Sequence, residues 1–184
     1  MKCDKKSNEC TVVTEDYCRW EQYAHPYFWF ERAQNLYDAA NAIRRAFWPG
    51  QGTYLSLKAA ESDFHKGPAY MLLVGLAVEV YLKGILVKKN PGFIKQQRLS
   101  NELIGHNLGA LYRKAGLSRI KVAYHSELLE RLTIYVEDFG KYPVTRNKNK
   151  MAKWLKIRFC SQTDFSRVDR LWDFLKKSAT KLGN

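Results

Sequence analysis

The chain has 184 residues, of which 46% are hydrophobic and 14% aromatic. This length and composition predict one globular domain with a substantial core and exclude a disordered chain. The formal net charge of +13 favours an anionic partner.

The positive charge is unevenly distributed along the chain. Residues 93–160 contain fourteen Lys and Arg against five Asp and Glu, whereas residues 1–92 contain twelve against ten. We therefore expect the anion-facing surface to come from the middle and later parts of the sequence.

Residues 1–25 are polar and lack a clear period, which predicts an irregular lead-in before a single domain over 26–184. No secretory signal pattern is present, so we expect a cytoplasmic protein. Cys3, Cys10, Cys18 and His25 form no closely spaced ligand pair, so free thiols are favoured over a zinc site. Motifs for phosphate loops, metalloproteases and nucleophile elbows are also missing, and we expect neither a metal nor a cofactor.

The first long helix is predicted over residues 26–48, before Pro49 and Gly50. Residues 51–66 are ambiguous and are consistent with one short helix. Apolar residues recur at helical spacing in the first segment: Phe30, Ala33, Leu36, Tyr37, Ala40, Ile43 and Phe47.

The longest apolar stretch, residues 68–89, predicts a central helix covered on several sides. Pro68 suits a first helical position, and Asn90-Pro91-Gly92 ends the pattern. Glu79 and Lys83, near the middle, argue against a membrane span. Their spacing predicts either a simple i,i+4 ion pair or a pair that also anchors groups from neighbouring helices.

Three more helices follow a basic connector over residues 91–105. Asn107 is the predicted N-cap of a short helix that ends at Gly116. Ser118 is the predicted N-cap of a longer helix that reaches Phe139. The last helix is predicted to begin at Thr163-Asp164. Their predicted buried residues are Leu108, Leu111, Tyr112, Leu128, Leu129, Leu132, Tyr135, Val136, Phe139, Phe165, Val168, Leu171, Trp172, Leu175, Ala179 and Leu182.

Three segments carry a family resemblance. The first, residues 77–83, fits the pattern A-x-E-x-x-L-K, in which Glu79 and Lys83 are the charged positions. The second, residues 105–108, reads G-H-N-L and contains His106. The third consists of Lys141, Tyr142 and Pro143. In this order the segments resemble the HEPN domains, one branch of which has R-Y-P at the third segment. Lysine here keeps the charge but loses arginine's two-pronged donor geometry.

The resemblance implies an all-α, up-and-down bundle of four long helices plus one or more short helices. It also implies a homodimer directed at RNA or a nucleotide, and the charges of Glu79 and Lys83 separately predict no membrane segment. Some such domains are metal-independent endoribonucleases of toxin-antitoxin or phage-defence systems. Others are non-catalytic interaction or nucleotide-binding modules that partner a minimal nucleotidyltransferase, and both alternatives stay open for this chain.

HEPN ribonucleases use an arginine followed by a histidine four to six residues later, and Arg119 with His125 fits that spacing. In such a site the histidine would move protons and the arginine would stabilise phosphate charge. The alternative places His125 at the edge of the core and Arg119 on the surface. For His106 a structural role in fixing a loop is favoured over catalysis.

Residues 144–160 are rich in cations and contain no acidic residue, in a pattern that fits either a strand or a basic helix. Lysine and arginine can neutralise phosphates and tryptophan can stack on a base, so we predict nucleic-acid contacts; a solvated loop is the alternative. The candidate residues are Arg146, Lys148, Lys150, Lys153, Trp154, Lys156 and Arg158.

Overall fold

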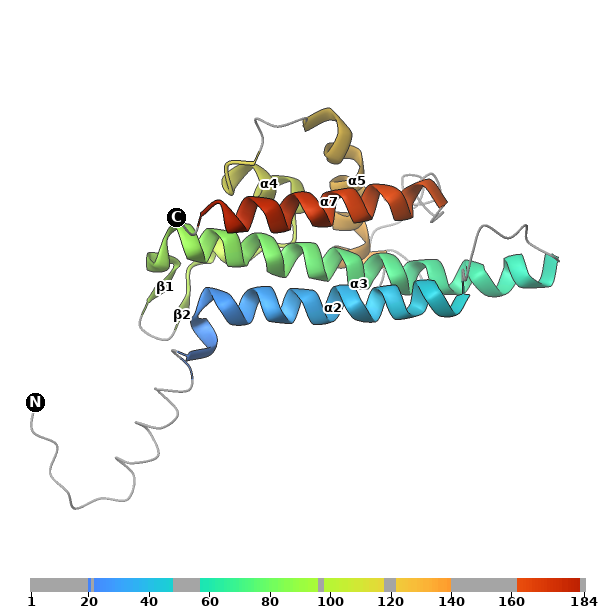
Figure 1. Cartoon of the computed structure of the whole chain (residues 1–184), viewed down its shortest axis with the longest axis horizontal. Coiled ribbons are helices and arrows are strands. Elements are labelled where there is room, and N and C mark those ends of the chain that lie inside the picture. The colour runs from blue at the N-terminus through green and yellow to red at the C-terminus, as the bar shows by residue number, and fades with distance from the viewer. Residues whose placement is uncertain are drawn as a thin grey trace, which may run out of the picture.

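The computed structural model describes residues 20, 22–47, 57–95, 98–117, 122–139 and 162–182. It is predominantly helical, which confirms the predicted all-α class (Figure 1). The longer helices are α2 (Pro26–Phe47), α3 (Leu57–Lys89), α5 (Val122–Ile134) and α7 (Gln162–Thr180), and α4 (Leu108–Lys114) is short.

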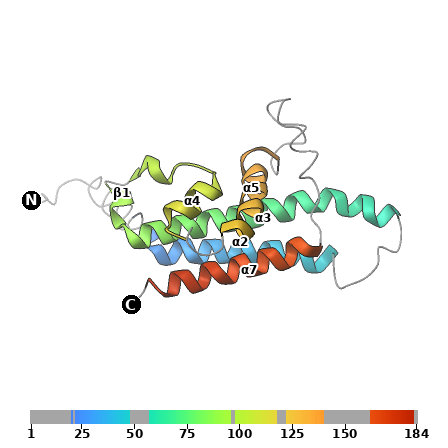
Figure 2. The same cartoon turned by 90° about the horizontal axis from the view of Figure 1, so that it is seen from above.

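Helices α2, α3 and α7 lie side by side along the length of the molecule (Figures 1 and 2). Helix α2 runs in one direction, and α3 and α7 run in the other. Helices α4 and α5 pack against α3, and α5 also contacts α7. Because α3 is in contact with every other helix named here, the prediction that it is central is confirmed.

The composition of α3 explains this position. Its apolar residues face nearly all directions, and most of them from Tyr70 to Val87 are buried. The segment Gly67–Lys89 is long and apolar enough to cross a membrane, but 78% of its apolar window is buried inside the protein. The central helix of a helical bundle can be equally long and apolar. The contacts of α3 with α2, α4, α5 and α7 bury it as such a helix is buried.

The predicted start of α3 is wrong. Pro68 lies inside the helix, which begins eleven residues earlier at Leu57, so Gly67 is not a break. Proline lacks one backbone donor and disfavours a helical conformation in the residue before it, but these costs are local. The many buried contacts of α3 offset them, and one continuous helix replaces the short helix considered for residues 51–66.

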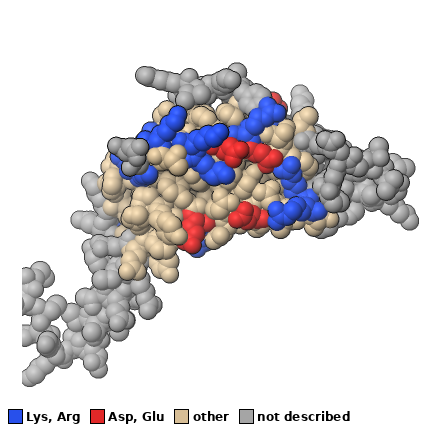
Figure 3. Space-filling view, viewed as in Figure 1, with Lys and Arg blue, Asp and Glu red and all other residues tan. Residues whose placement is uncertain are grey.

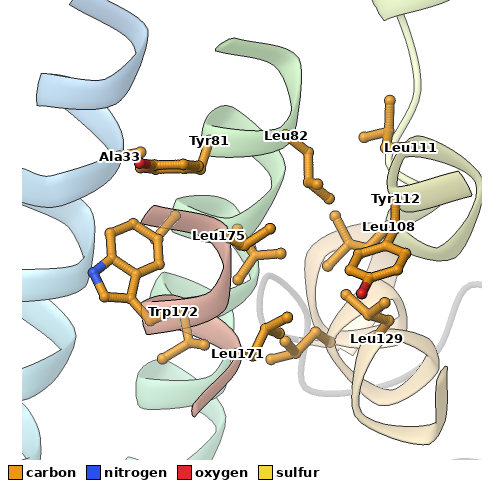
Figure 4. Packing of buried hydrophobic residues seen from close by; sticks show 14 of the residues in the cluster. Ala33, Tyr81, Leu82, Leu108, Leu111, Tyr112, Leu129, Leu171, Trp172 and Leu175 are labelled. Atoms are coloured by element: carbon orange, nitrogen blue, oxygen red, sulfur yellow. The ribbon is translucent and has the colours of Figure 1, made fainter. Parts of the chain in front are cut away.

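The core is an aromatic and aliphatic cluster between the helices (Figure 4). Trp172 of α7 stacks on Tyr37 of α2, with ring centroids 4.3 Å apart, and meets Tyr81 of α3 edge-on. Arg44 and Tyr37 both bind Asp169, which joins α2 to α7 at the rim of this cluster. The predicted apolar stripes of α2, α5 and α7 are confirmed by their described members.

The connection between α3 and α4 is short but structured. It consists of η1 (Pro91–Phe93), strands β1 (Ile94–Lys95) and β2 (Arg98–Leu99), and η2 (Asn101–Leu103). The strands are antiparallel, with Ile94 opposite Leu99. The sequence lacked the alternation of a longer strand, and only an irregular basic connector was predicted.

After α4, the predicted cap is confirmed: Gly116 has φ +71°, and Lys89 Nζ donates to the Ala115 carbonyl at 2.6 Å. Helix α5 continues into one π-helical turn, η3 (Tyr135–Phe139), so the predicted end at Phe139 agrees. Ser118 lies outside the described residues.

Candidate functional site around Glu79 and His106

Glu79 lies in the C-terminal half of α3, on the same side as Gly75 and Lys83. A Cβ at Gly75 would be only 2.6 Å from Val136 Cγ2 and 3.2 Å from the Leu132 carbonyl oxygen. Glycine is therefore required for α5 and η3 to approach this side of α3. The close approach buries Glu79 to 5% exposure beside the loop that leads into α4.

Both carboxylate oxygens of Glu79 accept hydrogen bonds. Lys83 Nζ donates to Oε1 at 2.6 Å, and His106 Nδ1 lies 3.0 Å from Oε2. Both alternatives for Glu79 and Lys83 therefore apply, because the i,i+4 pair also anchors a neighbouring segment. The A-x-E-x-x-L-K and G-H-N-L segments contact each other directly through Glu79 and His106.

Three successive residues fix the loop that carries His106. His106 binds α3, while Asn107 Oδ1 accepts from the Ala110 N–H at 2.8 Å and caps α4, as predicted. The Leu108 N–H donates to Thr133 Oγ1 of α5 at 3.0 Å, and Leu108 itself is fully buried. The segment thus ties α4 to both α3 and α5, which supports the structural role favoured for His106.

The contact with Glu79 also defines the chemistry of His106. A carboxylate can only accept, so Nδ1 carries the proton, and in the neutral ring Nε2 has the free lone pair. The His106 side chain is 49% exposed, and Nε2 has no hydrogen-bond partner in the described part of the chain. The arrangement can bind a ligand donor or accept a proton, with Lys83 balancing the carboxylate charge.

His125 has a different environment. It is 7% exposed, stacks on Phe174 with a centroid separation of 5.7 Å, and lies beside Tyr112. Burial, together with the positive charge of Arg167, lowers the pKa of His125 and favours the neutral ring. These observations favour a core-edge histidine. Arg119 lies outside the described residues, so the predicted Arg119–His125 pair stays a prediction.

Several other residues named in the sequence analysis also fall outside the described part of the chain. They are the third family segment, the basic residues between η3 and α7, and the N-terminal cysteines: Lys141, Tyr142, Pro143, Arg146, Lys148, Lys150, Lys153, Trp154, Lys156, Arg158, Cys3, Cys10 and Cys18.

Sequence reasoning missed a buried ion pair between α5 and α7. Arg131 donates to both carboxylate oxygens of Asp164, at 2.6 and 2.9 Å, and the side chains are 12% and 2% exposed. Burial opposes the charge of Arg131, but the hydrogen bond and charge of Asp164 raise the pKa of its guanidinium. The pair joins helices that lie on either side of the basic segment in the chain. Asp164 looked only like a helix-start residue, and no local signal distinguished it.

A cavity of about 320 Å³ is lined by residues of α4 and α5 and lies close to the loop that carries His106. Its lining residues are Asn107, Gly109, Tyr112, Arg113, Ser126, Leu129, Glu130 and Thr133. Periodicity predicted the buried members, whereas the hollow between the helices depends on tertiary packing.

Comparisons with protein-family models, curated proteins and solved structures found no significant match to this chain.

Proposed function

We propose that this chain is an RNA-directed protein of the HEPN kind, and that the segment between η3 and α7 binds the RNA backbone. The observation that carries the proposal is the distribution of charge. The described residues contain 18 Lys and Arg against 13 Asp and Glu, whereas the whole chain contains 31 against 18. Most of the net positive charge therefore lies elsewhere, with seven cations and no acid in residues 141–158.

The described surface is compatible with such a partner. Lysine and arginine side chains gather along α7 and its neighbours, with acidic side chains between them (Figure 3). The cations of α7 are Arg167, Arg170, Lys176 and Lys177, and Lys181 follows the helix directly. Helix α7 follows the basic segment in the chain, so an RNA strand on that segment could continue onto Arg167 and Arg170 in the first half of α7.

The HEPN assignment rests on the three segments and gains support from the contact between two of them. In this proposal α2, α3, α5 and α7 are the four long helices of an up-and-down bundle. We further propose the homodimer usual for such domains. A sedimentation experiment that showed only a 21.5 kDa monomer at tens of micromolar would contradict the dimer.

Between the two HEPN alternatives, the environment of His125 favours RNA binding without cleavage by this residue. A buried, neutral ring stacked on Phe174 is poorly placed to reach a ribose 2′-hydroxyl. RNA cleavage in the presence of a chelator, abolished in His125→Ala protein that remains folded, would instead establish the ribonuclease alternative.

The RNA proposal is tested by filter binding of a single-stranded RNA to two variants with equal reduction of charge. One carries Lys148→Gln, Lys150→Gln, Lys153→Gln and Lys156→Gln. The matched control carries Arg32→Gln, Arg45→Gln, Lys177→Gln and Lys181→Gln at exposed positions on α2 and at the C-terminal end of α7. We expect the first variant to bind much more weakly than the control; equal affinities would overturn the proposal.

The role of Trp154 needs a separate variant. If Trp154 stacks on a base, Trp154→Ala should cost about 1–3 kcal/mol of binding free energy without lowering the melting temperature. A lowered melting temperature would place this residue in the core and remove it from the RNA-binding set.

A further inference from the structure

Helices α3, α4 and α7 finish at the same end of the molecule, where lysines of α3 hold the other two. Lys88 Nζ donates to a carbonyl in the last turn of α7 at 3.1 Å, and Lys89 Nζ donates to the carbonyl of the residue that caps α4 at 2.6 Å. Helix α2 starts here as well, because a Cβ at Gly84 of α3 would be 2.9 Å from both Trp29 and Phe30. Figures 1 and 2 show the hairpin of β1 and β2 at this end too.

Cations gather at this end. The last turns of α3, α4 and α7 are basic, and the first turn of α2 contains no acidic residue. Among these described helix ends and the connection from α3 to α4, the one acid is Glu102, which binds Lys114. We call this region the basic end and define it by its cations: Lys88, Lys89, Arg98, Lys114, Lys177 and Lys181.

The charge of the basic end is larger than the helix termini require. Each helix C-terminus carries about half a negative charge, so one or two cations offset three of them. Six cations against one acid leave an excess of five positive charges, which equals the whole excess among the described residues, 18 cations against 13 acids. A negatively charged partner therefore complements this end of the molecule.

The exposed large hydrophobic side chains of the described residues lie at the same end. Tyr27 is in the first turn of α2 and, like Tyr23 before this helix, contacts the ring of Phe28. Leu99 lies in β2, and Ile104 follows η2, which an ion pair ties to the end of α4. Their exposed fractions show that they protrude into solvent: Tyr23 68%, Tyr27 59%, Leu99 43% and Ile104 67%.

We propose that the basic end docks on the surface of an anionic lipid bilayer, an interaction separate from the proposed RNA binding. Anionic headgroups attract cations that lie near the bilayer surface. Tyrosine is enriched at the interface of bilayer and water because its ring is apolar and its hydroxyl is polar. Leu99 and Ile104 would bury apolar surface at the boundary of the acyl chains. Docking of this kind leaves α3 in the core of the protein.

The combination of cations and protruding apolar side chains favours a bilayer over other partners. Pairing with the basic end of a second copy would bring like charges together. RNA would complement the cations, but Leu99 and Ile104 offer no ring on which a base can stack. An acidic protein segment has the charge of a bilayer, but peptide recognition uses grooves and pockets, whereas these side chains protrude.

The experiment is co-sedimentation of the full chain with lipid vesicles of two compositions. One consists of phosphatidylcholine alone, and the other has equal parts of phosphatidylcholine and phosphatidylserine, which adds negative charge. We expect binding on the order of tenfold tighter to the vesicles with phosphatidylserine, decreasing with added salt because salt screens the charges. Equal binding to both compositions, or binding to neither, would overturn the proposal.

A charge variant separates the basic end from the basic segment before α7, which anionic lipid would also attract. It is compared with a control that loses the same charge from that segment. The variant carries Arg98→Gln, Lys177→Gln and Lys181→Gln, and the control carries Lys148→Gln, Lys150→Gln and Lys153→Gln. We expect the variant to bind the anionic vesicles on the order of tenfold more weakly than the control. Equal binding of the two would contradict docking through the basic end.

An apolar variant tests the protruding side chains at constant net charge. It carries Tyr27→Ser, Leu99→Ser and Ile104→Ser, all at exposed positions, so its melting temperature should stay close to that of the parent. We expect binding to the anionic vesicles to weaken on the order of tenfold, because apolar burial at the interface is lost. Binding equal to that of the parent would show that only charge is involved and would overturn the proposal.

Two further measurements test the competing partners. If polyglutamate binds the parent, loses affinity for the charge variant and leaves the vesicles unbound, the basic end serves an acidic protein segment and the lipid proposal fails. Both variants should retain an RNA affinity close to that of the parent. A loss of RNA affinity as large as the loss of vesicle binding would make this end part of the RNA surface, which also contradicts the proposal.

Discussion

At the scale of single residues, the Glu79 carboxylate holds two donors at once, one from its own helix and one from the loop before α4. Glu79→Gln leaves one oxygen for two donors and turns an amide N–H₂ toward the other. Because Lys83 is only 12% exposed, its ammonium would be left without its partner in a place that water reaches poorly. We expect a decrease of about 3 kcal/mol in the free energy of unfolding, measured by urea denaturation followed by circular dichroism.

The matched control is Glu102→Gln, which removes an exposed carboxylate from its pair with Lys114. That change should cost less than about 0.5 kcal/mol, as is usual for surface pairs. Equal decreases in the two variants would show that the Glu79 contacts contribute no more than an exposed ion pair.

His125 gives a second prediction at this scale. Burial and Arg167 lower its pKa in the folded protein below the ordinary value of about 6.5. Between the two pKa values the unfolded chain binds the proton more readily, so acid favours unfolding. The contribution of His125 to stability is therefore present above about pH 6.5 and declines as the pH falls toward the folded-state pKa.

We expect the melting temperature of the parent protein to fall from pH 7.5 to pH 5.5 by more than that of His125→Gln. The control is His25→Gln, at an exposed position before α2, which should retain the pH dependence of the parent. Identical pH profiles for the parent and His125→Gln would contradict the assignment of a buried, neutral ring.

At the scale of elements, two helical glycines should respond oppositely to the same substitution. Gly75→Ala places a Cβ 2.6 Å from Val136 Cγ2, so it should destabilise the protein despite the better helix propensity of alanine. Gly109→Ala meets only ordinary contacts and should stabilise by up to about 1 kcal/mol. Chemical denaturation of both variants measures the difference; a stabilised Gly75→Ala would show that α5 does not pack closely on α3.

Some helices could be predicted from the sequence more accurately than others. Helices α2, α4, α5 and α7 were predicted with nearly their observed ends where these are described, because an apolar stripe and a capping residue both act locally. Asn107 and Gly116 are examples in which the predicted cap is observed. The start of α3 was missed because a proline stops a helix only if tertiary contacts do not compensate, and those contacts are invisible in a local pattern.

The candidate site shows the same limit. The four-residue spacing of Glu79 and Lys83 predicted their pair, since both lie on α3. The partnership with His106 spans 27 residues, and the Arg131–Asp164 pair spans 33. Such contacts depend on how helices pack, as does the hollow between α4 and α5, so periodicity predicted the buried residues but not the cavity.

At the scale of the whole molecule, the moderately basic helical body and the strongly basic segment before α7 have separate roles. The helices provide a stable frame, and the Arg131–Asp164 pair joins α5 to α7 on either side of the basic segment in the chain. The lysines of that segment provide affinity for phosphates through release of counterions, which depends on salt and little on sequence.

The salt dependence of RNA affinity is therefore the sharpest test of phosphate binding by these lysines. Filter binding of a single-stranded RNA at several salt concentrations gives the slope of log affinity against log salt. For the variant with Lys148, Lys150, Lys153 and Lys156 changed to glutamine, we predict a slope flattened by roughly 0.7 for each phosphate that is no longer neutralised, with the matched control close to the parent. The same slope for the parent and the lysine variant would contradict the account, because those lysines would then neutralise no phosphate.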